Sequence, residues 1–328
     1  MGAEVMRNST PQRHLPEGVS VVVPVYNGAD TLPDLITALE PVLRSVAPAF
    51  EVVLVNDCSP DESWKVITEL ARKYPWVRGI NLMRNFGQQN TTLCGLRAAR
   101  YDTIVTMDDD LQNPPDQIPI LLDKLREGFD VVYGPPLHEQ HGLFRDAASS
   151  ITKMALANAM GADVARSVNS FRAFRTHLRD ALSDYRSPHV SIDVLLTWTT
   201  TRYGVVRVRH DTRPAGRSGY NLRKLIRHAL NLITGFSAAP LQLASVVGFL
   251  SMLFGLAILV FVMVRFVLVG RDVPGFTMLA STIAIFSGVQ LFMLGVFGEY
   301  LARIHFRMLE RPTYAVRETT DEPEENAC

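Results

Sequence analysis

Three consecutive carboxylates carry the clearest chemical signal in this chain, in the run Asp108-Asp109-Asp110-Leu111-Gln112. Adjacent carboxylates repel one another, so such a run persists easily only where a positive group, most simply a divalent cation, neutralises it. Hard oxygen ligands favour Mg²⁺ or Mn²⁺ over zinc. The alternative is an acidic helix N-terminus, because Asn113-Pro114-Pro115-Asp116 can open a helix.

The elements that must position this run alternate between strand and helix patterns. The predicted strands are Val19–Val25, Glu51–Asn56, Val77–Leu82, Asp102–Met107 and Phe129–Tyr133. The predicted helices are Thr31–Val46, Asp61–Lys73, Gln88–Arg100 and Asp116–Glu127. Continuous apolar strands suit a parallel sheet covered on both faces, so the pattern predicts a doubly wound α/β domain. The acidic run then lies at the carboxyl end of a strand, where open α/β sheets bind ligands.

The loop after the first strand excludes two common nucleotide sites. Pro24-Val25-Tyr26-Asn27-Gly28 holds a single glycine, so neither the dinucleotide fingerprint nor a P-loop is present. A nucleotide diphosphate bound here would need a metal and side chains to neutralise it. Farther on, residues Gly142 to Tyr203 read as mostly helical and basic, and a last strand is expected at Gly204–Arg209.

Two apolar segments late in the chain predict membrane spans. Leu241–Val264 and Phe276–Gly298 contain no charged residue, and each is long enough to cross about 30 Å of hydrocarbon. Buried core helices are the alternative. Basic residues before the first span and after the second predict that the chain lies in a bacterial inner membrane, with the large N-terminal domain and both termini on the cytoplasmic side. The amphipathic, basic stretch Asn221–Ser237 predicts a helix in the membrane interface, or one packed on its own domain.

Composition argues against nucleic acid as a partner and against a cysteine metal site. Among 328 residues, 33 Lys and Arg balance 33 Asp and Glu, so no global field attracts nucleic acid. The three cysteines, Cys58, Cys94 and Cys328, have no metal-ligand spacing and read as reduced thiols. No secretory signal precedes the first strand.

Five regions follow from these patterns. We expect a disordered N-terminus at 1–18, an α/β domain at 19–220, an interface helix at 221–239, a transmembrane hairpin at 240–298 and a cytoplasmic tail at 299–328. The tail, with its acidic stretch at residues 318–325, reads as disordered and solvating.

The sequence resembles glycosyltransferase family 2, and within it the polyisoprenyl-phosphate glycosyltransferases. These include dolichol-phosphate mannose synthases and undecaprenyl-phosphate glucosyl- and formamido-arabinose transferases, the last being nearest. The motifs that carry the resemblance are VVVPVYNG at 21–28, VNDCSPD at 55–61, RNFGQQN at 84–90, DDDLQNPP at 108–115, SFRAFR at 170–175, RPAGRSGY at 213–220 and GEYLARIHFRMLERPTY at 298–314. The likeness covers Val19 to about Tyr314.

The resemblance implies a GT-A nucleotide-sugar domain and a role for each matching residue. Nucleotide-sugar contacts are expected from Pro24, Tyr26, Asn27, Asp57, Arg84, Asp108 and Asp109. The metal, Mg²⁺ or Mn²⁺, is expected on Asp110 and Gln112. The acceptor phosphate is expected at Arg145, Ser149, Arg213, Ser218, Tyr220 and Lys224. The catalytic set is then Asp108, Asp110 and Arg145.

Several of these residues can instead have purely structural roles. Asp57 can cap the helix that begins near Pro60, and Arg145 can be a solvated helix charge. Tyr220 can be an interface anchor, and Arg84 can stabilise its own loop.

The chain departs from the family pattern at several positions. Gly28 stands where the family usually has Glu, and Asp109 where it has a small residue. The segment after the fifth strand, which includes Pro135, lacks the usual arginines, and Gly219 replaces a common lysine. His138 or Arg172 are candidates to supply the missing positive charge.

The implied activity is transfer of a sugar from a nucleotide diphosphate sugar, with UDP favoured by analogy, to a polyisoprenyl phosphate such as undecaprenyl or decaprenyl phosphate, with inversion. The alternatives are a membrane-anchored nucleotide-sugar-binding scaffold and a processive polysaccharide synthase. The synthase needs more spans and a Gln-x-x-Arg-Trp motif, which this sequence lacks. A homo-oligomer through the spans is a further expectation.

Overall fold

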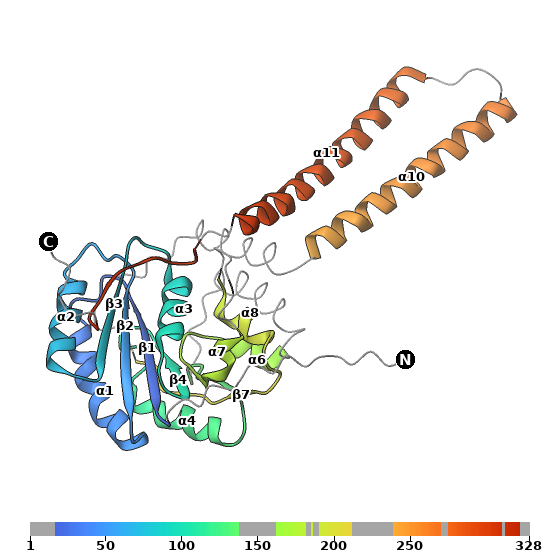
Figure 1. Ribbon diagram of the computed structural model, residues 1–328. Helices are drawn as coiled ribbons and strands as arrows, with labels where there is room; N and C mark the ends of the chain where they lie inside the picture. The colour runs from blue at the N-terminus through green and yellow to red at the C-terminus, as the bar shows by residue number, and fades with distance from the viewer. Residues whose placement is uncertain are drawn as a thin grey trace, which may run out of the picture. The chain divides into compact units, whose positions relative to one another are not determined.

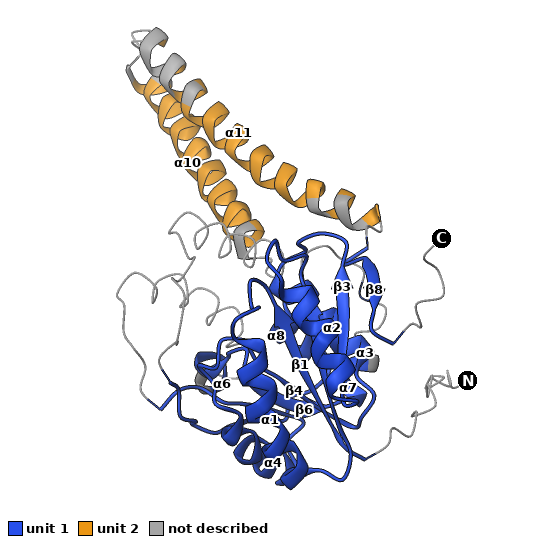
Figure 2. Cartoon of the chain, turned by 90° about the vertical axis from the view of Figure 1, so that its left-hand side faces the viewer, with its two compact units in different colours: residues 1–220, 311–328 blue, residues 221–310 orange. Residues whose placement is uncertain are grey.

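The computed structural model describes residues 17–137, 162–181, 185, 190–211, 239–269, 275–309 and 312–321. The chain divides into two compact units, coloured separately in Figure 2. The α/β unit is Met1–Tyr220 with Arg311–Cys328, and the helical-hairpin unit is Asn221–Glu310.

A mixed sheet of eight strands forms the centre of the α/β unit, in the order β7-β5-β6-β4-β1-β2-β3-β8. The strands are β1 (Val19–Val25), β2 (Phe50–Asn56), β3 (Val77–Leu82), β4 (Thr103–Thr106), β5 (Val131–Tyr133), β6 (Arg172–Arg175), β7 (Tyr203–Val205) and β8 (Val316–Thr319). The five strands predicted in the first half are confirmed. Neighbours β4-β1-β2-β3 run parallel, so their carboxyl ends share one edge.

Helices cover both faces of this sheet (Figure 1). They are α1 (Leu32–Val46), α2 (Ser63–Lys73), α3 (Gln88–Ala98), η1 (Pro115–Gln117), α4 (Ile118–Arg126), α6 (Ala162–Ser167), α7 (His177–Asp180) and α8 (Ile192–Thr197). Leucine and isoleucine side chains of α1, α2 and α4 form the main apolar core together with alternate residues of β1, from Val19 to Val25. α3 lies on the opposite face, where Gly95 of α3 comes so close to Val22 that a Cβ would clash. Burial on both faces explains why these strands read as continuous apolar runs.

One central strand lies in a region that was predicted to be mostly helical. β6 sits between β4 and β5 and is antiparallel to both. Phe171, Ala173 and Phe174 are fully buried. The segment is therefore buried on both faces and shows neither strand alternation nor helical periodicity.

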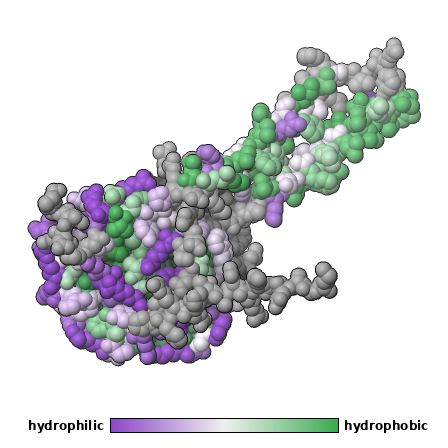
Figure 3. Space-filling model, viewed as in Figure 1, coloured by the Kyte–Doolittle hydropathy of each residue, from purple (hydrophilic) through white to green (hydrophobic). Residues whose placement is uncertain are grey.

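The helical-hairpin unit consists of α10 (Ala239–Val269) and α11 (Gly275–Met308), which pack against each other. Gly255 of α10 leaves room for the ring of Phe286 of α11. Segments Leu241–Arg265 and Ile285–Ala302 are long and apolar enough to cross a membrane, and their side chains are mostly exposed (Figure 3). Both predicted spans lie within these two helices.

The expectation of a disordered tail from residue 299 is wrong for the part of it that the structure describes. α11 continues to Met308, and residues 316–319 then form β8, an edge strand antiparallel to β3. The acidic side chains Glu318 and Asp321 hydrogen-bond to Asn81 and Arg78. Composition alone predicted solvation, but arginine and amide partners on the sheet edge bind these acids.

Candidate active site

Backbone strain marks the carboxyl edge of the sheet. Asn27, Cys58 and Leu111 are the non-glycine residues with positive φ in the part of the chain that the structure describes, at 56°, 52° and 57°. They follow β1, β2 and β4 respectively, so all three lie at the same edge. Such conformations are costly for residues other than glycine and cluster at functional sites. The acidic run lies at this edge, as predicted.

Asp108 is held in place by two neutral donors. The Gln88 amide donates to Oδ1 at 2.6 Å, and the Ser170 hydroxyl donates to Oδ2 at 2.6 Å. These donors come from the start of α3 and from the residue preceding Phe171 and β6. Burial, and then the charge of Asp110, raises the pKa of Asp108 against the opposing effect of these hydrogen bonds. Both donors lie in the motifs at 84–90 and 170–175, but these motifs predicted no role for either side chain.

Asp109 is the least compensated of the three carboxylates. Its Oδ2 is buried and has no hydrogen-bond partner among the described residues. Desolvation, and then the charges of Asp108 and Asp110, raise the pKa of Asp109 to about 7, while the backbone of Tyr26 lowers it. A Cβ on Gly28 would overlap this same Oδ2 atom. The two departures from the family pattern, Gly28 and Asp109, are therefore in direct contact and depend on each other.

Asp110 is buried, and its Oδ1 accepts a hydrogen bond from the Gln112 N–H at 3.1 Å. This short turn brings the two predicted metal residues together around Leu111. The loop after β7 lies alongside, because the Asp211 N–H donates to the Gln112 carbonyl at 2.8 Å. His210 Nδ1 lies 3.3 Å from Asn113 Oδ1. His210 and Asp211 were not predicted at this site, because they lie about 100 residues away in the sequence and only the fold brings them near it.

The loop after β1 is hydrogen-bonded to the segment that follows β2. The backbone N–H groups of Asn27 and Gly28 donate to the hydroxyls of Ser59 and Ser63 at 3.2 and 3.0 Å. Tyr26 is 50% exposed at the rim of the site. Pro24 lies within β1 and continues the sheet beneath it. The predicted nucleotide residues of this loop therefore share one rigid turn.

Asp57 is buried and holds the neighbouring loop. Its two carboxylate oxygens accept hydrogen bonds from the backbone N–H groups of Phe86 and Gly87, at 2.7 and 2.9 Å. Gly87 is the N-cap of α3. The carboxylate thus caps α3 rather than the helix that follows Pro60. The Arg84 guanidinium lies 4.6 Å from the Phe86 ring centroid, so Arg84 has a loop-stabilising contact of its own.

Arg172, one of the two suggested sources of positive charge, forms an internal ion pair. Its side chain is only 3% exposed, in an ion pair with Asp193. The same Asp193 carboxylate accepts a hydrogen bond from the Tyr133 hydroxyl. Arg172 is therefore an internal cation beneath the site, and its charge lowers the pKa of Asp108.

The other suggested cation, His138, and all predicted acceptor-phosphate residues lie outside the described residues. The latter are Arg145, Ser149, Arg213, Ser218, Tyr220 and Lys224. The described part of the site thus contains the residues that were predicted to contact the nucleotide and the metal.

Comparison with known proteins agrees with this geometry. The family model described as Glycosyl transferase family 2 matches residues 20–186. An undecaprenyl-phosphate 4-deoxy-4-formamido-L-arabinose transferase of Klebsiella pneumoniae is 32% identical over 93% of this chain and 94% of its own length. The protein of the same name from Yersinia enterocolitica is 34% identical over 91% of this chain and 92% of its own.

A solved structure shares the fold. Glucosyl-3-phosphoglycerate synthase from Mycobacterium tuberculosis, crystallised with Mn²⁺, UDP and glucosyl-3-phosphoglycerate, is similar with a TM-score of 0.51 at 17% identity. The match covers 66% of this chain and 78% of that one. It supports the predicted GT-A arrangement of the α/β unit.

Proposed function

Because the chain belongs to glycosyltransferase family 2, we propose that it transfers a sugar from a nucleotide diphosphate sugar, with UDP as the nucleotide, to a polyisoprenyl phosphate. The observation that carries this proposal is the acidic run at the carboxyl edge, with a buried carboxylate oxygen of Asp109 lacking a partner among the described residues. The names of the relatives from Klebsiella and Yersinia support undecaprenyl phosphate as the acceptor. The two apolar helices fit an enzyme that works on a membrane lipid.

The side chains of the site fit a divalent cation of the Mg²⁺ or Mn²⁺ kind, held by Asp110 and Gln112. No three His, Cys, Asp or Glu side chains form a ready cage among the described residues. That arrangement suits an ion that takes one or two protein oxygens and completes its shell with water and substrate phosphates. When bound, the ion would neutralise the departing diphosphate.

The reaction needs little acid–base chemistry from the protein. The second pKa of a phosphate monoester is about 6, so the acceptor is largely dianionic at neutral pH. An acceptor oxygen forms the new bond to the anomeric carbon, and the bond from that carbon to the donor diphosphate breaks. The diphosphate leaves with the electron pair, and the configuration inverts. The chain's own residues orient the reactants, with Asp108 fixed by Gln88 and Ser170.

Arg145, Ser149, Arg213, Ser218, Tyr220 and Lys224 are the proposed acceptor residues. Flanking positive charge supports a cytoplasmic position for the α/β unit and both termini. Homo-oligomerisation through the apolar helices is part of the same proposal.

The test supplies membranes containing the full chain with undecaprenyl phosphate and labelled UDP- and GDP-sugars, with and without a chelator. Chelator-sensitive label in the organic extract from one donor supports the proposal and identifies the sugar. Growing oligosaccharide chains would indicate a polysaccharide synthase instead. Metal-dependent nucleotide binding without any lipid label would favour the scaffold alternative.

A further inference from the structure

Residues 312–321, which we name the C-terminal strap, add to the edge of the sheet beside the nucleotide site. β8 pairs with β3 from Ile80 to Leu82, with an irregularity between Asn81 and Leu82. The Thr320 hydroxyl accepts a hydrogen bond from the Gly79 N–H at 2.8 Å. The strap is therefore fixed by backbone pairing and by side chains along its length.

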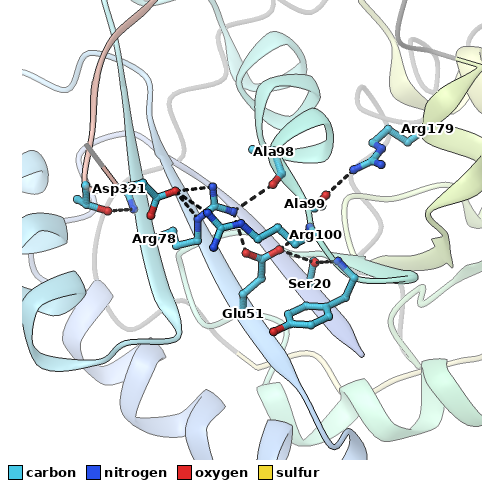
Figure 4. A network of polar contacts seen from close by, with 11 residues as sticks. Ser20, Glu51, Arg78, Ala98, Ala99, Arg100, Arg179 and Asp321 are labelled. Atoms are coloured by element: carbon cyan, nitrogen blue, oxygen red, sulfur yellow. Dashed lines mark hydrogen bonds and ion pairs between the residues drawn. The ribbon is translucent and has the colours of Figure 1, made fainter. Parts of the chain in front are cut away.

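Ion pairs anchor the end of the strap at the amino edge of the sheet (Figure 4). Asp321 bridges Arg78 at 2.6 Å and Arg100 at 3.0 Å. Arg78 also pairs with the buried Glu51 at 2.8 Å. Arg78 and Glu51 are largely buried, whereas Asp321 is 36% exposed, so the strap binds the outer side of a buried ion pair.

The other end of the strap is anchored on α3. The Arg97 guanidinium lies 5.6 Å from the centroid of the Tyr314 ring. Thr313 is 5% exposed. The half-buried Tyr314 also hydrogen-bonds to Cys94 and Arg97. This end is thus held by the Tyr314 ring and hydroxyl and by the Thr313 hydroxyl, which accepts a hydrogen bond from Arg97 at 3.4 Å.

Between these anchors the strap holds the first residue of the Arg84 loop. The Met83 N–H donates to the Ala315 carbonyl at 2.9 Å, and the Arg317 guanidinium donates to the Met83 carbonyl at 3.3 Å. Asp57 holds the other end of this loop at Phe86 and Gly87. The loop then leads into Gln88, the donor to Asp108.

We propose that the C-terminal strap is a positioning element of the nucleotide site, which fixes the Met83–Gly87 loop and through it Arg84 and Gln88. This inference rests on the proposed function, since it assumes that the loop contacts the nucleotide. It assigns a role in donor binding to the chain that follows the second apolar helix.

The test compares three variants of the full chain. Tyr314→Ala removes the ring on Arg97, and Tyr314→Phe keeps that ring but loses its hydroxyl. Tyr74→Ala is the matched control, because Tyr74 is also half-buried, stacks under Lys73 at 5.0 Å and lies outside the strap and the loop. The probe is UDP with Mn²⁺, measured by calorimetry, and amide hydrogen exchange is followed in residues 83–88.

Tyr314→Ala is expected to raise the Kd for UDP roughly fivefold to tenfold and to speed exchange in the loop. Tyr314→Phe should stay within about twofold of the unaltered chain, as should Tyr74→Ala. Partial unfolding would reduce the number of binding sites and leave the Kd unchanged, so the Kd separates positioning from stability.

Three outcomes would each overturn a claim. If the unaltered chain binds UDP and Tyr314→Ala binds it equally well, the strap has no role in the nucleotide site. Unchanged loop exchange in Tyr314→Ala also overturns the proposal, whether or not UDP binds. If the unaltered chain binds no UDP, the proposed donor is wrong, and the exchange data still show whether the strap fixes the loop.

Discussion

The two edges of the same sheet both hold carboxylates, but the protein neutralises them differently. At the amino edge, Glu51 and Asp321 are paired with Arg78 at 2.8 and 2.6 Å (Figure 4). At the carboxyl edge, the contacts of Asp108 are neutral donors, and Oδ2 of Asp109 has no hydrogen-bond partner among the described residues. A compensated cluster stabilises the fold, whereas an uncompensated one is typical of a site awaiting a charged ligand.

The difference extends to the backbone. The loops at the carboxyl edge contain Asn27, Cys58 and Leu111 with positive φ. At the amino edge, the Glu51 carboxylate accepts hydrogen bonds from the Ser20 hydroxyl at 2.7 Å and from the Arg100 backbone N–H at 2.6 Å. Positive backbone φ angles and the unpartnered Oδ2 of Asp109 therefore occur together at the carboxyl edge. If this contrast is functional, substitutions at the two edges must separate activity from stability.

The largest expected effect is at Asp110. Asp110→Ala should lower turnover by a factor on the order of 10³, because it removes the predicted metal carboxylate from the departing diphosphate. The measurement is transfer of label to undecaprenyl phosphate by purified full-length protein. Asp123→Ala is the control, since Asp123 is an exposed acid paired with Arg126 on α4. Activity that survives in Asp110→Ala with its chelator sensitivity intact would refute the metal assignment.

Glu51 should show the opposite behaviour. Glu51→Ala removes a buried acid that satisfies three donors, from Ser20, Arg78 and Arg100. The free energy of unfolding should fall by about 3 kcal/mol, as expected when one member of a buried charge pair is removed. Turnover per folded molecule should stay within about twofold of the unaltered chain. Chemical denaturation and active-site titration measure the two quantities, and a large loss of turnover in folded protein would contradict the contrast between the edges.

Gly28 and Asp109 offer an intermediate effect within the active edge. Gly28→Glu forces a side chain into the space of the Asp109 carboxylate. Overpacking and charge repulsion should reduce kcat/KM roughly tenfold to a hundredfold. Adding Asp109→Ala removes the overlap and should restore most of the activity. A double-mutant cycle measures this coupling, and purely additive losses would show that the two departures are independent.

The sequence predicts the parallel half of the fold well because its signals are local. β1 to β4 are continuous apolar runs, and Asp108 to Asp110 follow one of them directly. β6 and β8 were missed because distant parts of the chain stabilise them. Phe174 of β6 pairs with Ile104 and Val131, and Glu318 of β8 hydrogen-bonds to Asn81. No local pattern in an acidic segment reveals such partners.

The same limit applies within the site. Asp57 and the acidic run were predicted from motifs, but their partners were not. The Asp57 contacts with Phe86 and Gly87 cross about 30 residues, and Ser170 reaches Asp108 across 62. Arg172 was suggested only as a source of positive charge for the site, and its ion pair with Asp193 was not predicted. Its burial with Asp193 depends on β6, the strand that the sequence did not reveal.

The smallest expected effect is a pH dependence of stability from Asp109. Burial and its acidic neighbours raise the pKa of Asp109 to about 7, far above the value of the unfolded chain. Between about pH 4 and 7 the folded state therefore binds more protons than the unfolded state, and stability falls as pH rises through this window. Coupling to Asp108 and Asp110 limits the contribution to about 1 kcal/mol.

That contribution should be visible in thermal unfolding at pH 5 and pH 7.5 with a chelator present. Asp109→Asn cannot titrate, so its Tm should fall about 2–4 °C less than that of the unaltered chain between the two pH values. The Tm of Asp123→Asn should fall by as much as that of the unaltered chain between the two pH values, because Asp123 is exposed. Mn²⁺ with UDP should reduce the dependence, since bound cations favour the ionised carboxylate. Parallel slopes for all three proteins would mean that Asp109 is already compensated, and the carboxyl edge would then resemble the amino edge.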